Sequence, residues 1–89
     1  MSGKVDDDVG TLRVIEGPDR GLTRSFDRPA LRIGSGAEAD VQLADRSVSK
    51  LHCELAPSGG RVRVRDLGSK NGTWIAGCRI GDAEAPVGT

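Results

Sequence analysis

The sequence has few aromatic residues, few cysteines and no long apolar run, and each shortage excludes a class of protein. Only Phe26 and Trp74 are aromatic among 89 residues, so a core has to come from Val, Leu, Ile and Ala. Two cysteines cannot build the disulfide scaffold of a small secreted protein. Because no apolar run is long enough for a signal peptide or a membrane span, we expect a cytoplasmic protein.

A net charge is also missing. Thirteen basic residues balance thirteen acidic ones, so the chain has no cationic excess for a broad nucleic-acid surface. Because residues 1–10 are acidic, residues 11–89 carry a small net positive charge. That charge suits one local anion site better than a groove for nucleic acid. Neither Cys53 nor Cys78 belongs to a CxxC pair, and His52 is not at zinc-ligand spacing. We therefore expect no metal and no cofactor, and two reduced cysteines half-buried in strands.

What the sequence does contain is a series of short segments that alternate apolar and polar residues. Alternation with a period of two is typical of a β-strand with one buried face. About eight such segments follow at roughly the eight- to twelve-residue spacing of a β-sandwich, and none has a long helical period. The expected strands start at Thr11 and continue with Leu22–Phe26, Ala30–Ile33, Val41–Leu43, His52–Ala56, Val62–Arg65, Thr73–Ile75 and Cys78–Ile80.

The two ends of the chain lack this alternation. Residues 1–10 are polar and acidic and are expected to form a flexible tail. Residues 81–89 carry no strand pattern, so the expected domain spans 11–89 and is truncated at its C-terminus. An all-β sandwich of short antiparallel strands would then miss its last one or two strands. Its exposed edge strand would allow self-association.

The glycine-rich segment from Gly34 to Ala39 matches GxGxxA, the dinucleotide fingerprint. That fingerprint needs a helix whose N-terminus faces the pyrophosphate. Asp40–Leu43 reads as a strand and leaves no room for such a helix. We therefore expect a bend whose backbone N–H groups can still face an anion.

Ser49, His52 and Asp66 are the residue types of a hydrolytic triad, but no nucleophile elbow surrounds the serine. His52 begins an apolar strand, where a single histidine is usually a structural hydrogen-bonding group. We therefore expect no enzymatic activity.

Asn71-Gly72 is the strongest turn dipeptide of the chain. It predicts a hairpin between Val62–Leu67 and Thr73–Ile75, with Gly72 at positive φ. Such a turn can also present the Asn71 amide outward, so the structural and functional interpretations are compatible.

Several separate motifs resemble the forkhead-associated (FHA) domain in both order and spacing, over about residues 11–80. The resemblance implies an FHA-type β-sandwich whose loops at one end bind phosphothreonine peptides, as a non-catalytic signalling module. The motifs are Ile33-Gly34, Asp40–Leu43, Ser49–His52, Asp66–Trp74 and Gly77.

The resemblance also implies a role for each matching residue. Ser49 would donate to the phosphate, with Lys50 and the Ser69-Lys70 loop beside it, and Asn71 would hold the peptide backbone. Hydroxyls, lysines and backbone amides on rigid strand ends are the charge-assisted donors that a phosphate dianion needs. An asparagine side chain both donates and accepts, so it can pair with an extended peptide. The residues implied to keep the loops in shape are Gly34, His52 and Gly72.

One position departs from the family. Ser35, itself a candidate contact, stands where the family has an arginine that grips the phosphate. A hydrogen bond to a charged group is worth about 1.5–3 kcal/mol, so its loss would weaken binding roughly ten- to a hundredfold. Arg32, Arg46 and Lys70 are candidates to replace that cation. The alternative function is a phosphate-independent interaction or oligomerisation module with a degenerate phosphate site.

The sequence of residues 10–34 is similar to that of FHA segments at the N-terminus of bacterial sigma-54-dependent transcriptional activators. This second resemblance implies the sensor segment of a transcriptional regulator. The expected partner is a protein or peptide that contains phosphothreonine. Direct contact with nucleic acid or a membrane is not expected.

Overall fold

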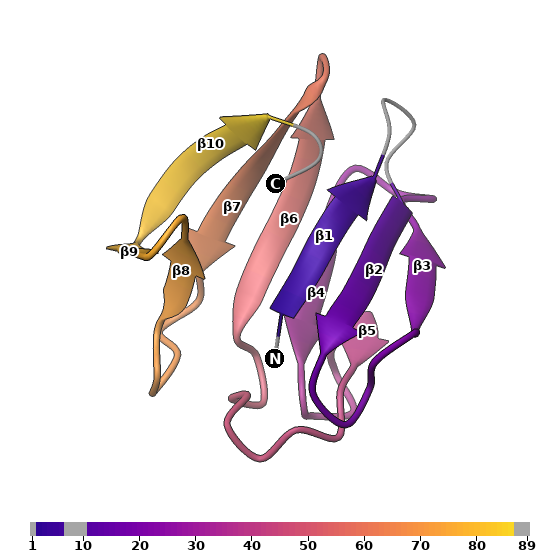
Figure 1. Ribbon diagram of the computed structural model, residues 1–89, viewed down its shortest axis with the longest axis vertical. Coiled ribbons are helices and arrows are strands. Elements are labelled where there is room, and N and C mark those ends of the chain that lie inside the picture. Colours follow the sequence, from indigo (N-terminus) through magenta and orange to yellow (C-terminus); the bar gives the residue numbers. More distant parts are fainter. Residues whose placement is uncertain (1, 7–10, 87–89) are drawn as a thin grey trace.

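The chain forms two facing β-sheets and a separate β-hairpin. The computed structural model describes residues 2–6 and 11–86, and within them no helix is long and apolar enough to cross a membrane. The strands of this described part run along the chain as shown in Figure 1. They are β1 Ser2–Asp6, β2 Thr11–Glu16, β3 Thr23–Ser25, β4 Leu31–Gly34, β5 Val41–Gln42, β6 Cys53–Ser58, β7 Arg61–Asp66, β8 Thr73–Ile75, β9 Cys78–Ile80 and β10 Asp82–Pro86.

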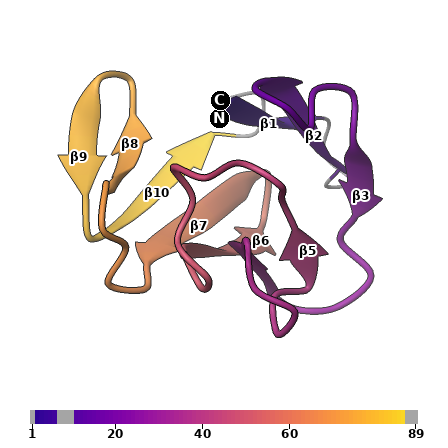
Figure 2. The same cartoon turned by 90° about the horizontal axis from the view of Figure 1, so that it is seen from below.

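The larger sheet has five strands in the order β10-β7-β6-β4-β5, and the smaller sheet has three in the order β1-β2-β3. β8 and β9 pair only with each other among the described strands. Neighbouring strands are antiparallel except β4 and β5, which run parallel. Figure 2 shows β1–β3 facing the larger sheet, with the β8–β9 hairpin standing apart from them. The all-β sandwich expected from the sequence is confirmed.

The core lies between the two sheets and is aliphatic, as the composition predicts. In β7, Val62 and Val64 are buried while the arginines beside them are exposed. Of the two aromatic residues, Phe26 packs against the core and Trp74 is 59% exposed. The buried apolar residues are Leu12, Val14, Leu31, Ile33, Val41, Leu43, Val48, Cys53, Leu55, Val62, Val64 and Ala85.

The N-terminal prediction was wrong for residues 2–6. These residues form β1 and pair antiparallel with β2, with Asp6 opposite Thr11. β2 is anchored by its buried inner face, and its free edge offers backbone groups that any extended segment can pair with, whatever its side-chain pattern. The rest of the expected tail lies outside the described residues.

The expectation of no strand after Ile80 was also wrong. β10 pairs along the whole of β7, and Ala85 is buried while Glu84 and Pro86 are exposed. Its inward-facing side chains are alanines, which give too weak an apolar signal to recognise in the sequence. Ion pairs from Arg61 to Glu84 and from Arg63 to Asp82 join the outer faces of the two strands.

The hairpin prediction for Asn71-Gly72 was wrong in its strands, although Gly72 does have a φ of +87°. β7 pairs with β6 and β10, so β8 does not return along it. The two-residue hairpin turn lies instead at Ala76-Gly77, with φ values of +50° and +78°, as a primed turn requires.

The two cysteines are free, but neither is half-buried. Cys53 is buried in β6 and Cys78 is exposed in β9. Burial raises the pKa of Cys53 to about 12, with a further contribution from the Asp66 charge. Cys53 therefore stays a thiol in the core.

Candidate functional site

Three loops lie at one end of the sandwich: the bend after β4, the loop before β6 and the loop between β7 and β8. In Figure 1 the first two lie below β4, β5 and β6, and the third lies below β7 and β8. The glycine-rich bend after β4 lies against the loop before β6. The Ser35 N–H donates to Ser49 O at 2.9 Å, and the Gly36 N–H donates to Lys50 O at 3.1 Å. These amides therefore bind a neighbouring loop, which corrects the expectation that they face an anion.

Gly34 makes this close approach possible. A Cβ atom added at Gly34 would lie 1.9 Å from Lys50 O, a distance that no side chain can occupy. Gly34 is buried at the end of β4 and its carbonyl accepts from the Leu43 N–H at 2.8 Å. The glycine is needed here for space, because its φ is not in the left-handed region.

His52 joins the second loop to the third. His52 is 5% exposed, and its Nδ1 accepts from the Ser49 N–H at 3.1 Å. Because Nδ1 accepts, the proton sits on Nε2, which donates to Gly72 O at 2.8 Å. Neither bond involves the Ser49 hydroxyl or Asp66. The contacts of these residues are therefore those of a loop clamp rather than of a hydrolytic triad.

Asp66 organises the third loop from its carboxylate. Oδ2 accepts from the backbone N–H of Gly68 at 3.1 Å and of Ser69 at 3.0 Å. Oδ1 accepts from the hydroxyls of Ser69 and Thr73. Burial raises the pKa of Asp66, but these hydrogen bonds outweigh it and leave the pKa below the usual 3.8. The carboxylate is thus held as an anion at the base of the loop.

Ser69 belongs to this internal network. It is 7% exposed, its hydroxyl donates to Asp66, and its Oγ accepts from the Gly72 N–H at 3.0 Å. The structure therefore places Ser69 among the groups that shape the loop, rather than on its outer surface.

Ser49 and Lys70 meet at the outer surface. The Lys70 N–H donates to Ser49 Oγ at 3.0 Å, across 21 residues of sequence. The Ser49 hydroxyl still has its own proton to donate. Lys50 and Lys70 are both exposed, and within residues 11–86 no carboxylate lies at ion-pair distance from either ammonium group. The Ser49 hydroxyl and the backbone of Lys70, from two loops, are thus brought together, and both lysine side chains are exposed.

Asn71 is exposed next to this pair. Its Nδ2 donates to Ser47 O at 2.9 Å, and its backbone carbonyl accepts from Trp74 Nε1 at 3.1 Å. The amide oxygen and the second N–H of Nδ2 remain for a ligand. Asn71 therefore faces outward while its backbone and amide are fixed from two sides.

The candidates to replace the family's arginine are placed differently from one another. Arg32 has its guanidinium 3.9 Å from Asp40, on the outer face of β4. Ser35 is half-buried, and its carbonyl accepts from Gln42 Nε2 at 3.1 Å. Arg46 is exposed in the loop before β6. Of the three candidate cations Arg32, Arg46 and Lys70, Lys70 is the one whose backbone N–H donates to the Ser49 hydroxyl.

Several residues that hold the site had no role assigned to them from the sequence. Asp66, Ser47 and Thr73 supply the loop contacts just described. Asp45 accepts from the Ser47 N–H and hydroxyl, and the hydroxyl bond is the main reason that its pKa is lowered. An aspartate two or three residues before a serine is a turn signal, and it occurs at both places. That spacing would have pointed to Asp45, Ser47 and Asp66, but not to Thr73.

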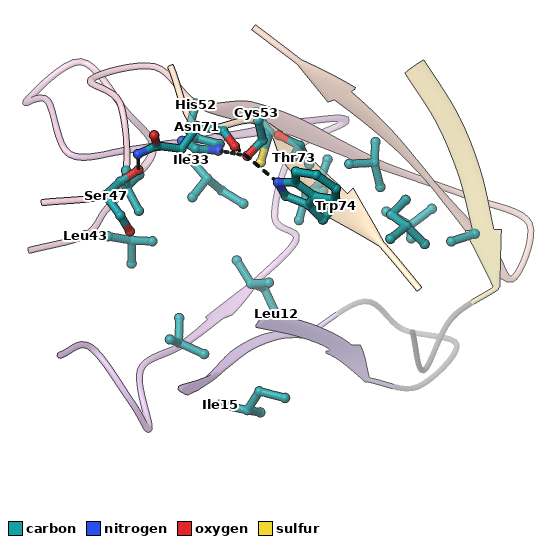
Figure 3. Close-up of a pocket in the computed structure, with 18 of the residues that line it drawn as sticks. Leu12, Ile15, Ile33, Leu43, Ser47, His52, Cys53, Asn71, Thr73 and Trp74 are labelled. Atoms are coloured by element: carbon teal, nitrogen blue, oxygen red, sulfur yellow. Dashed lines mark hydrogen bonds between the residues drawn. The ribbon is translucent and has the colours of Figure 1, made fainter. Parts of the chain in front are cut away.

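A cavity of about 520 Å³ opens between the two sheets beside these loops. Figure 3 shows Ser47, Asn71 and Trp74 along one side of the cavity, and Leu12 and Ile15 of β2 along the other. Its deeper lining is the aliphatic core. The cavity reaches the surface between the β8–β9 hairpin and the smaller sheet.

The fold and the three loops at one end of the sandwich together define an FHA domain. Solved structures of FHA domains are similar to this chain. The FHA domain of CT664 from Chlamydia trachomatis superposes with a TM-score of 0.78 at 29% identity, over 85% of this chain and 79% of that one. A domain from a study of phosphothreonine-dependent FHA domain interactions gives 0.73 at 29% identity, over 84% and 76%. The resemblance to FHA domains stated from the sequence is confirmed.

Within that class, residues 13–89 match the family described as "Inner membrane component of T3SS, cytoplasmic domain", and the chain belongs to this family. A curated relative is the oxoglutarate dehydrogenase inhibitor of Corynebacterium diphtheriae, which is 39% identical over 75% of this chain and 47% of its own length. The chain spans about half the length, or less, of the curated relatives it matches first.

Proposed function

We propose that this domain is a non-catalytic module that binds phosphothreonine peptides through Ser49, Lys50, Lys70 and Asn71. The observation that carries the proposal is the meeting of Ser49 Oγ with the Lys70 backbone, beside two lysines that no carboxylate of the described residues neutralises. A phosphate dianion needs a fixed group of hydrogen-bond donors and positive charge. The phosphothreonine dependence named for a similar FHA structure supports the same ligand.

Ser35 and Ser69 take lesser parts in this proposal. Ser69 is buried and supports the loop through Asp66. Ser35 lies at the edge of the site without the charge of an arginine. Lys50 and Lys70 would supply the positive charge instead.

The test compares one peptide with and without its phosphate, using Ser49→Ala and the exposed Ser58→Ala as a matched control. A phosphothreonine peptide library identifies the sequence, and isothermal titration then measures affinity. Loss of a hydrogen bond to a charged group should weaken S49A by about tenfold or more, while S58A binds like the parent. Equal binding of phosphorylated and unphosphorylated peptides would contradict the proposal.

A second function, a phosphate-independent interaction module, is favoured by the cavity and its borders. Ile15 is 42% exposed and Trp74 59% exposed at the opening, and the facing edges of β1 and β8 have no partner strand among the described residues. An added strand, from a second copy or another protein, would fit such a gap.

Ser35→Arg separates the two functions. If the parent ignores phosphate and S35R gains phosphopeptide binding, the parent is a degenerate phosphate site and the second function holds. If parent and variant bind the phosphopeptide alike, lysines replace the arginine and the first function holds.

The wider role is a proposal as well. We propose that this domain is the sensor segment of a bacterial transcriptional regulator and is located in the cytoplasm. The proposal rests on the similarity of residues 10–34 to FHA segments of sigma-54-dependent activators. This proposal predicts an ATPase domain next to this one in the gene product, and a gene product without one would contradict it.

A further inference from the structure

The turn dipeptide Asn71-Gly72 joins a side-chain amide to a residue that has no side chain. The backbone nitrogen that follows an asparagine can attack the carbon of the side-chain amide, and a side chain on the next residue hinders this attack. Deamidation is therefore easiest where glycine follows asparagine. Asn71 is the only asparagine of the sequence, and no aspartate in the sequence is followed by glycine. Isoaspartate, a product of this reaction, would thus report on position 71.

The fold requires glycine at position 72. Gly72 has a φ of +87°, in the left-handed region that favours glycine. A Cβ atom added there would lie 2.6 Å from Arg79 Nε, so a side chain would also have to displace Arg79. The chain therefore keeps a chemically labile dipeptide, and the rate of its reaction depends on how the structure holds it.

The peptide group that joins Asn71 to Gly72 is hydrogen-bonded on both sides. Its carbonyl, Asn71 O, accepts from Trp74 Nε1 at 3.1 Å, and its N–H, on Gly72, donates to Ser69 Oγ at 3.0 Å. The next carbonyl, Gly72 O, accepts from His52 Nε2 at 2.8 Å. Gly72 is also buried, which shields its nitrogen from water. The attacking nitrogen therefore cannot turn toward the Asn71 side chain without breaking hydrogen bonds.

The Asn71 side chain is held less completely than this nitrogen. Its Nδ2 donates to Ser47 O at 2.9 Å, but the residue is exposed to water. The nitrogen that would attack it is bound to Ser69, whose hydroxyl is oriented in turn because it donates to Asp66. The Asp66 network thus restrains the nucleophile of the reaction.

We propose that Asn71 is a site of spontaneous deamidation, which the third loop prevents while its hydrogen bonds hold and which local opening of that loop permits. In the open loop, Gly72 N forms a bond to Asn71 Cγ, the Cγ–Nδ2 bond breaks, and Nδ2 leaves as ammonia with the Gly72 proton. Water then opens the cyclic imide at either of its carbonyl carbons and gives aspartate or isoaspartate. The reaction needs only water, and the inference does not depend on phosphothreonine binding.

The products would weaken the contact between the second and third loops. A carboxylate at position 71 has no N–H to donate to Ser47 O, so two acceptors would face each other. Isoaspartate also routes the main chain through Cγ, which lengthens the backbone of the turn and disturbs the bonds to Ser69 and Trp74. The groups that shape the third loop would thus also protect it from chemical damage.

The experiment follows isoaspartate formation by peptide mapping and mass spectrometry in the parent, Ser69→Ala, Trp74→Phe and the control Ser58→Ala. Each protein is incubated folded and unfolded in urea, at the same pH and temperature. Removal of one hydrogen bond should raise the folded-state rate about three- to tenfold in S69A and W74F, while S58A matches the parent. The folded parent should react at least about tenfold more slowly than the unfolded parent, because opening breaks both bonds. In urea all four proteins should react at one rate.

Val62→Ala separates opening of the loop from unfolding of the whole domain. Val62 is buried near the opposite end of β7 from Asp66, so V62A lowers stability without removing a hydrogen bond of the turn. Enough urea is added to V62A to bring its free energy of unfolding to that of S69A or below, and S69A should still deamidate faster. A V62A rate equal to that of S69A would overturn the proposal. So would a folded parent that reacts as fast as the unfolded chain, or S69A and W74F rates equal to that of the parent. If S69A fails to fold, W74F takes its place in these comparisons.

Discussion

At the scale of single residues, the binding end is held from below by His52 and Asp66. His52 connects the second loop to Gly72, and Asp66 gathers the third loop around its two oxygens. Neither has to touch a ligand to matter, because both fix the positions of Ser49 and Asn71. Fixed donors bind more tightly than mobile ones, since less ordering is needed on binding.

We predict that Asp66→Asn lowers stability at neutral pH by about 1–2 kcal/mol, because an amide cannot accept as strongly from the two backbone N–H groups and two hydroxyls. The Asp66 pKa is lowered in the folded state. Its contribution is therefore complete above the unfolded value near 3.8 and is lost as the pH falls through the lower folded value. Urea unfolding between pH 7 and pH 3 checks both points.

In that experiment, the parent should lose more stability on acidification than D66N does. Glu38→Gln is the matched control, because Glu38 is an exposed acid in the first loop. An acid dependence as steep in D66N as in the parent would show that Asp66 does not have this role.

The roles of these residues were only partly visible in the sequence. The resemblance pointed to Ser49, Lys70 and Asn71 at one end, and the structure brings them together there. It also pointed to Ser69 as a ligand contact, but a hydroxyl has one proton and that proton goes to Asp66. Which way a serine turns depends on its neighbours in space, and those cannot be seen in a linear sequence.

At the scale of strands and loops, the two-residue period predicted the positions of most of the strands. Thr73–Ile75 and Cys78–Ile80 were predicted with the bounds of β8 and β9. β1 and β10 were missed because backbone pairing and two alanines hold them, and neither leaves a strong apolar pattern. The pairing partner of β8 was predicted wrongly for a different reason. Turn residues such as Asn71-Gly72 show that the chain bends, but they do not show which strand the next segment pairs with.

We predict that Gly34→Ala separates the first loop from the second, because its Cβ would overlap Lys50 O. Overpacking of this kind costs about 1–3 kcal/mol. Gly81→Ala is the matched control, since nothing lies within 4 Å of an added Cβ there. Thermal unfolding measures the difference between the two variants, and equal melting temperatures would contradict the prediction.

At the scale of the whole molecule, charge is balanced overall and unevenly placed. On the outer face of the larger sheet, Arg61 pairs with Glu84, and Arg63 binds Asp82 at 2.9 and 2.6 Å. The loop end keeps Lys50, Lys70 and Arg79 without such partners among the described residues. A neutral chain can thus carry one local anion site, as the sequence suggested.

We predict that phosphopeptide binding weakens below about pH 6, where the phosphate takes up its second proton, and weakens with added salt. The ligand loses charge in the first case, and the lysines are screened in the second. Titrations at pH 5 and pH 7.5, each at two salt concentrations, measure both effects. Affinity that stays constant across all four conditions would show that charge does not dominate binding.

Phosphothreonine binding by the loop end is tested most directly by an NMR titration of the isotope-labelled domain with a phosphothreonine peptide and its unphosphorylated counterpart. We expect large shifts at the backbone amides of Ser49, Lys50, Lys70 and Asn71 with the phosphorylated peptide only. The amides of Arg61 and Val62, at the far end of β7, should stay in place. Shifts that are the same for both peptides, or that are absent from these loop residues, would contradict it.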